Sequence, residues 1–165
     1  MALTYPPFKI AKNFSDTFEV RRLVYQGGAA TIDAGTPTKE NASHATYVAI
    51  CVDGDGTTSQ RFSGFAKGVS TDTASVAGAV EVYFPIPNIV YRGAAKTAST
   101  ADTQAEIDAL VGKRVVFDLT STTWSVDAAA ADATTNGVMI VGGNPRTSEL
   151  DFIITTAIST ANPTT

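Results

Sequence analysis

The chain has little of the chemistry from which catalytic and metal sites are built. Among 165 residues there is one cysteine, Cys51, and one histidine, His44. A single cysteine excludes a disulfide framework, and one residue of each type is too few for a zinc site. If the segment between them is extended, the two lie roughly 23 Å apart on opposite faces, so they are not expected to form a nucleophile and base pair. We expect no catalytic residue, no cofactor and no metal.

Charge is also scarce. Only 17% of residues are charged, against ~25% in typical soluble domains, and the net charge is −4. Nucleic-acid binding needs a clustered positive surface, so this class of partner is not expected. No segment reaches the ~18 consecutive apolar residues of a membrane span, and the opening MALTYPPFKIAKN lacks the apolar run of a signal peptide. We therefore expect no membrane partner and synthesis in a cytoplasm.

Alanine and threonine are abundant, with 25 and 24 residues. Threonine is β-branched and tolerates half-exposed positions on a pleated surface, so its abundance favours a β-rich fold. Interface cores are depleted in charge, so the same composition suits a surface that lies against a partner.

The hydrophobic pattern has a period of two residues in several short segments. Apolar residues alternate in 80–84, 115–119, 124–126 and 150–154, as in half-buried strands. Continuous apolar runs at 47–52, 89–91 and 138–141 are too short for helices and are interpreted as strands covered on both faces. Glycine and proline separate these segments, and because Pro85 and Pro87 cannot donate to a sheet, the segment 84–88 is expected to bridge two strands or to lie at an edge. The pattern predicts a single β-barrel or β-sandwich domain.

One segment has the helical pattern. Thr103 and Glu106 form a capping box, apolar residues share one helical face, and Gly112 supplies the end. We expect one short helix over about 103–111, whereas the alanine-rich segment 127–136 is interpreted as a loop. The expected organisation is an N-terminal arm over 1–12, a β domain over 13–158 and a C-terminal tail over 159–165.

The acidic stretch 53–58, DGDGTT, is either an ion-binding loop or the turn of a hairpin. Counted from Asp53, the positions where a calcium loop requires glycine and glutamate hold Thr58 and Gly64. The stretch fails at both, so it is interpreted as a hairpin turn with positive φ at its glycines. Elsewhere the carboxylates are scattered, so a hydrolase with carboxylates that converge in space stays open as a third functional class.

Several segments together resemble the decoration, or cement, proteins of tailed-bacteriophage heads. They are AGTP at 34–37 with the strand after it, RFSGFAKGVS, GAVEVYFPIPNIVYRG, DTQAEIDALVG with KRVVFDL, and GVMIVGGNP with LDFII. The resemblance covers about 30–154 and rests on structural motifs. It implies a small, mostly β, non-enzymatic homotrimer that binds the major capsid protein on the outer surface of the virion. It also implies synthesis in the host bacterial cytoplasm.

The N-terminal arm is the expected contact with the partner. Tyr5, Pro6, Pro7 and Phe8 are the candidate residues, because aromatic side chains anchor interfaces and proline lowers the entropy lost on ordering. The alternative from another class is a carbohydrate-binding or receptor-binding β module in which Trp124 or Tyr91 stacks on sugar rings. Trp124 alternates with Val126, which favours a core position for its side chain.

Overall fold

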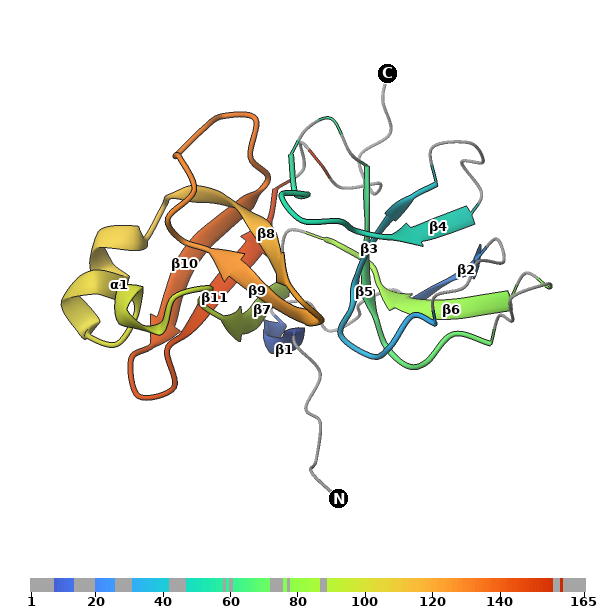
Figure 1. The fold of residues 1–165 in the computed structure, drawn as a ribbon, viewed down its shortest axis with the longest axis horizontal. Coiled ribbons are helices and arrows are strands. Elements are labelled where there is room, and N and C mark those ends of the chain that lie inside the picture. Colours follow the sequence, from blue (N-terminus) through green and yellow to red (C-terminus); the bar gives the residue numbers. More distant parts are fainter. Residues whose placement is uncertain are drawn as a thin grey trace.

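The computed structural model describes residues 8–13, 20–25, 31–41, 47–57, 59, 61–71, 76, 78–86, 89–155 and 158. The described residues form strands with one short α-helix, so the expected mainly β fold is confirmed (Figure 1). The strands are β1 (Phe8–Asn13), β2 (Val20–Tyr25), β3 (Pro37–Glu40), β4 (Tyr47–Ile50), β5 (Phe62–Ala66), β6 (Gly78–Tyr83), β7 (Ile89–Ala94), β8 (Arg114–Thr120), β9 (Thr123–Asp127), β10 (Val138–Asn144) and β11 (Glu149–Ile154). The helices are the 3₁₀ turn η1 (Ala98–Thr100) and α1 (Gln104–Leu110).

The strands divide into a six-stranded sheet and a closed barrel. The sheet has the order β1-β7-β11-β10-β8-β9, and the barrel has the order β2-β4-β3-β5-β6. The two lie side by side, with β1 near the middle of the molecule (Figure 1). All five barrel strands lie between β1 and β7 in the sequence. Along the chain, the whole barrel therefore separates β1 from the other strands of its sheet.

The six-stranded sheet curls back on itself beyond β7. Ala95 forms a parallel bridge with Val126 of β9, and the N–H of Lys96 donates to the carbonyl of Val126 at 2.9 Å. On its other side, the N–H of Ala95 donates to the carbonyl of Ser148, the residue before β11. The chain after β7 therefore joins β9 to the start of β11. The sequence left barrel and sandwich open, and the structure shows one closed barrel beside a curled sheet.

The larger core is shared between the two sheets. Phe62 and Phe65 of the barrel strand β5 pack with Phe117 and Phe152 of the six-stranded sheet. The ring centroids of Phe62 and Phe117 are 5.5 Å apart, and those of Phe65 and Phe152 are 6.0 Å apart. Such ring pairs add about 0.5–1.5 kcal/mol each beyond the area they bury. The sheets are therefore parts of one folded body, although a second cluster (Ile32, Val48, Ala66, Val80 and Val82) fills the barrel by itself.

The expected alternation appears only in part, because the intervening Asp118, Ser125 and Asp151 are also buried and Phe84 and Leu119 are only partly buried. Val115 and Phe117, Trp124 and Val126, and Leu150, Phe152 and Ile154 are all buried. The run 89–91 is buried at each position, as expected for a strand covered on both faces, but Val141 in β10 and Val52 after β4 are exposed. The interpretation of the runs 47–52 and 138–141 as covered on both faces is therefore wrong. Some apolar residues of these two runs are exposed to solvent.

The helix begins and ends as its sequence signals predict. The Thr103 hydroxyl accepts from the Glu106 N–H, and the Glu106 carboxylate accepts from the Thr103 N–H, which completes the capping box. Gly112 follows with φ of +87°. Among the described residues, 127–136 forms turns and no helix, as expected.

The stretch 53–57 has the expected glycine geometry and an unexpected partner. Gly54 and Gly56 have φ of +76° and +107°, but β4 and β5 both pair with β3 and not with each other, so the hairpin interpretation is wrong. The stretch instead lies along β8: the Gly54 N–H donates to the Phe117 carbonyl at 3.0 Å, and the Phe117 N–H donates to the Asp55 carbonyl at 2.8 Å. The loop thus joins the barrel to the six-stranded sheet.

Candidate interaction site

Of the four expected contact residues, one lies in the described structure. Tyr5, Pro6 and Pro7 fall outside the described residues. Phe8 begins β1 and is 3% exposed, with its ring 5.0 Å from Phe65 and 5.4 Å from Phe117. A side chain buried in the core of its own chain is not available to a partner, so Phe8 is corrected from a contact residue to the anchor of the strand.

The boundary expected for the arm changes for the same reason. Residues 8–12 pair with β7 in an antiparallel register from Phe8 opposite Gly93 to Lys12 opposite Val90, with an irregularity between Ile10 and Lys12. Apolar alternation in FKIAK is short, and the segment lies far in sequence from its partner strand. These features explain why the sequence pattern does not predict the strand. The segment before the sheet is therefore 1–7.

Charged side chains on β1, β7 and β11 form two ion pairs. The Lys9 ammonium lies 2.7 Å from the Glu149 carboxylate, and the Arg92 guanidinium makes two hydrogen bonds of 2.6 and 2.8 Å to Asp151. The hydrogen bond to Asp151 raises the pKa of Arg92. Burial by itself raises the pKa of Glu149, but hydrogen bonds from Lys9 and Thr147 outweigh it and hold that pKa below its ordinary value. The Arg92–Asp151 pair joins two residues that lie opposite each other on β7 and β11, whereas the Lys9–Glu149 pair links β1 to β11 across β7.

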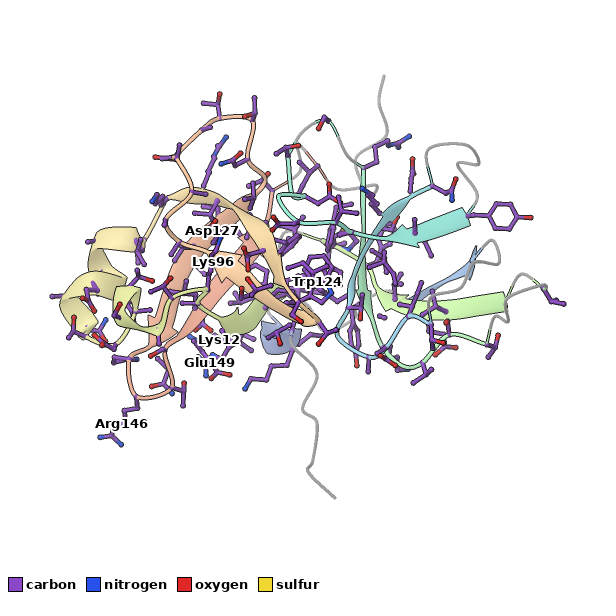
Figure 2. The ribbon with its side chains drawn as sticks, viewed as in Figure 1. Lys12, Lys96, Trp124, Asp127, Arg146 and Glu149 are labelled. Carbon is purple, nitrogen blue, oxygen red and sulfur yellow. The ribbon has the colours of Figure 1, made fainter. Side chains whose placement is uncertain are left out.

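A second group of charges surrounds Lys96, which follows β7. Its ammonium lies 2.6 Å from Asp118 and 3.1 Å from Asp127, and Figure 2 shows Lys96 beside Asp127. Burial by itself raises the pKa of Asp118, but hydrogen bonds from Lys96, Thr120 and Ser125 outweigh it and hold that pKa below its ordinary value. The hydrogen bonds to Asp118 and Asp127 raise the pKa of Lys96. The group closes the curl of the sheet where β7 meets β9.

The third pair lies at the junction of the two sheets. The Lys39 ammonium and the backbone N–H of Val52 both donate to one oxygen of Asp55, each at 2.6 Å. The neighbouring Cys51 is buried. Burial raises the pKa of its thiol well above the ordinary value, and the Asp55 carboxylate raises it further. A neutral buried thiol is a small core side chain and a poor nucleophile.

These arrangements use the carboxylates structurally. Asp55, Asp118 and Asp151 are buried, and each accepts from a cation on another segment. In the described part of the chain, no group of three or more His, Cys, Asp or Glu side chains is placed to hold a metal ion. His44 lies outside the described residues. The same part of the chain contains no helix that is long and apolar enough to cross a bilayer.

Both aromatic residues considered for sugar stacking are buried. Trp124 is 5% exposed and belongs to the shared core, as its alternation with Val126 predicts. Tyr91 is buried beneath Phe65, at 4.6 Å between ring centroids, and its hydroxyl donates to the Phe84 carbonyl. Burial raises the pKa of Tyr91 above its ordinary value. Neither ring is available to stack on a sugar.

The sequence contains no local signal for the three ion pairs whose carboxylates are buried. Lys39 and Asp55 are 16 residues apart, Lys96 and Asp118 are 22 apart, and Arg92 and Asp151 are 59 apart. Only the strand order brings them together, and strand order does not follow from the period of a hydrophobic pattern. In comparisons with known proteins, no family model, curated protein or solved structure matches this chain.

Proposed function

We propose that this chain is a decoration protein of a tailed-bacteriophage head. It binds the outer surface of the capsid as a homotrimer and stabilises the shell by bridging subunits of the major capsid protein. It acts without catalysis and without a cofactor. The proposal begins from the resemblance of residues 30–154 and is supported by the placement of β1.

The observation that carries the proposal is the anchoring of the first described strand. In a protein that bridges capsid subunits, the segment that contacts a subunit must be attached firmly to the folded body. Phe8 lies among three rings of the core, with Phe152 as the third at 5.6 Å. Phe8 therefore begins a firmly held strand, and a fully extended chain of seven residues spans ~23–25 Å. Tyr5, Pro6 and Pro7 remain the proposed contacts.

The three buried aspartates support a structural rather than a catalytic role. A hydrolytic carboxylate pair needs one carboxyl with a raised pKa beside an ionised partner. The buried carboxylates at Asp55, Asp118 and Asp151 instead face Lys39, Lys96 and Arg92. The third functional class, a hydrolase, therefore has no support in these groups.

A carbohydrate-binding or receptor-binding module is the second candidate. Trp124 and Tyr91 are its candidate stacking residues, and both rings are buried. A carbohydrate-binding or receptor-binding module would therefore have to bind through a surface that does not include these two rings. We favour the decoration protein over this module.

Co-sedimentation with purified phage heads tests the proposal. Heads of the phage that encodes this chain, freed of the bound protein, should take it up saturably, with copies in the hundreds, because the site repeats over an icosahedral lattice. Removal of residues 1–7 should weaken uptake and leave the fold intact. Removal of 1–12 is a poorer test, because it deletes β1 and the Phe8 anchor. A handful of copies per head, or none, would overturn the proposal in favour of the receptor or glycan module.

A further inference from the structure

A small groove runs along the outer edge of β1, where the six-stranded sheet meets the barrel. Its volume is about 270 Å³. One wall holds Phe8, Lys9 and Ile10, and the other includes Ala34, Lys67 and Tyr83. Consecutive residues of a strand point to opposite faces of the sheet. Three successive residues of β1 line this groove, and among the described residues β1 is the terminal strand of its sheet, so the groove lies beside the strand that has a free edge.

The size and walls of the groove suit a peptide better than a small molecule. Pockets for drug-sized ligands and cofactors occupy about 300–1,000 Å³ and enclose most of the ligand. This groove is smaller and opens along a strand edge, so it accepts one or two side chains of an extended segment. An edge strand also offers backbone donors and acceptors to a segment laid beside it.

The charges at the groove select the chemistry of that segment. Lys9 and Lys67 belong to the lining, and the described residues that form the lining include no carboxylate. Their ammonium groups pair outside the lining with Glu149 at 2.7 Å and Glu81 at 3.6 Å, and both lysines are about half exposed. Exposed ion pairs contribute little to stability, so an incoming carboxylate can replace or share either partner. The segment that fits is therefore extended and acidic, with an apolar side chain directed at Phe8 and Ile10.

We propose that this groove is the docking site for an extended acidic segment of a partner polypeptide, which adds beside the edge of β1. The inference rests on the proposed function, under which the partner is the major capsid protein. The described residues that line it are others than the proposed contacts Tyr5, Pro6 and Pro7. It would hold the capsid chain against the body of this protein, where the two sheets meet.

Head binding by two charge variants of the full chain tests the groove. The first carries Lys9→Gln and Lys67→Gln. The matched control carries Arg61→Gln and Arg146→Gln, which change the net charge equally. Arg61 pairs with Glu40 at 3.4 Å and is exposed much like Lys9 and Lys67, and Arg146 projects from the turn between β10 and β11 (Figure 2). The groove variant should bind heads about tenfold more weakly, and the control should bind like the wild type.

A steric variant repeats the test without a change in charge. Ala34→Trp fills the groove with a large ring and should abolish most head binding, whereas Ala105→Trp on the exposed face of α1 should not. Thermal unfolding of each variant identifies any loss of fold. A benzophenone attached to the introduced thiol of a Lys67→Cys variant should cross-link to the capsid chain on illumination, and one attached in an Arg61→Cys variant should not. Cys51 is buried and stays unlabelled.

The outcomes separate the two proposals. If the wild type binds heads and both groove variants bind equally well, the groove proposal is overturned and the decoration function stands. If the cross-link joins two copies of this chain instead of the capsid chain, the groove is a contact within the oligomer and the proposed partner is wrong. If the wild type does not bind heads at all, the decoration function fails, and the capsid partner of the groove fails with it.

Discussion

The backbone carbonyl of Asp55 accepts a hydrogen bond from the N–H of Phe117 at 2.8 Å, which joins the loop after β4 to the middle of β8. The carboxylate of the same residue is bound by the Lys39 ammonium on β3. Asp55 therefore connects a barrel strand, a glycine-rich loop and the six-stranded sheet. Because the aromatic core also crosses this boundary, we expect the two sheets to unfold together as one cooperative unit.

Asp55→Asn tests the importance of this junction. The amide oxygen can still accept from the Val52 N–H, but Lys39, whose side chain is 21% exposed, loses its counter-charge. Removal of one partner from a buried pair costs about 3–5 kcal/mol. The partial exposure of Lys39 reduces the expected cost to about 2 kcal/mol in the free energy of unfolding, measured in urea. Asp53→Asn, at an exposed position whose side chain accepts from the Leu119 N–H, is the control and should change stability by less than about 0.5 kcal/mol.

Phe8→Ala tests whether β1 is part of the folded body or of an arm. Loss of a ring from a packed aromatic core costs about 3–5 kcal/mol, so the variant should be strongly destabilised in a guanidinium titration. Lys12→Ala, on the same strand and exposed, should stay close to the wild type. Equal stability of the Phe8→Ala variant and the wild type would mean that Phe8 does not hold β1 in the sheet. The anchoring of β1, which supports the proposed function, would then be contradicted.

Gly64 lies against the backbone of β6 and should not tolerate a side chain. A Cβ at this position would meet the Tyr83 carbonyl oxygen at 2.2 Å, and the residue has φ of +131°. Gly64→Ala should therefore cost at least about 3 kcal/mol, because strain and overlap add. Gly54 also has positive φ but open space around it, so Gly54→Ala should cost only about 1–2 kcal/mol. Similar losses of stability in the two variants would show that backbone strain alone sets the cost of Gly64→Ala, and that close packing of β5 on β6 does not add to it.

Local signals in the sequence predict the elements better than their arrangement. The capping box of Thr103 and Glu106 and the alternation at Leu150, Phe152 and Ile154 depend on residues a few positions apart, and both features form as expected. The partner of the loop at 53–57 is β8, more than sixty residues away. The choice between a hairpin and this long-range pairing depends on the packing of the whole core, which no short window contains.

The candidate site shows the same division. The aromatic and proline residues at 5–8 suggest one contact segment, yet the ring of Phe8 fills a space formed by Phe65, Phe117 and Phe152. That space is created by three distant strands. The groove beside β1 likewise combines Lys9 with Lys67, and no spacing rule relates them. The position of an interaction surface depends on tertiary structure, which composition does not contain.

Fluorescence of Trp124, the single tryptophan, should report a buried ring. Its emission in the native state should be blue-shifted and poorly quenched by acrylamide, because the side chain is 5% exposed. Unfolding in guanidinium should shift the emission to the red and make it quenchable. A red, readily quenched native signal would contradict the burial of Trp124 and would return the sugar-stacking alternative to consideration.

Acid should weaken the fold through Asp118. Its pKa in the folded state is lowered, because hydrogen bonds from Lys96, Thr120 and Ser125 outweigh the effect of burial, whereas an unfolded aspartate has a pKa of about 3.9. A lowered pKa means that the unfolded chain binds the proton more readily than the folded one. The stabilisation is therefore fully present above about pH 5 and is lost as the pH falls through about 3.9 toward the folded pKa.

Asp118→Asn isolates this contribution. At pH 7 the variant should be about 1–2 kcal/mol less stable than the wild type in urea, because a hydrogen-bonded charge is lost while Lys96 keeps Asp127 and contact with solvent. The difference should shrink as the pH is lowered from 5 toward 3, because the wild-type carboxylate becomes protonated and the variant has no proton to gain there. Asp108→Asn, exposed on α1, is the matched control and should follow the wild type over the whole range. A difference between Asp118→Asn and wild type that stays constant down to pH 3 would show that Asp118 stabilises the curl of the sheet through hydrogen-bond geometry and not through its charge.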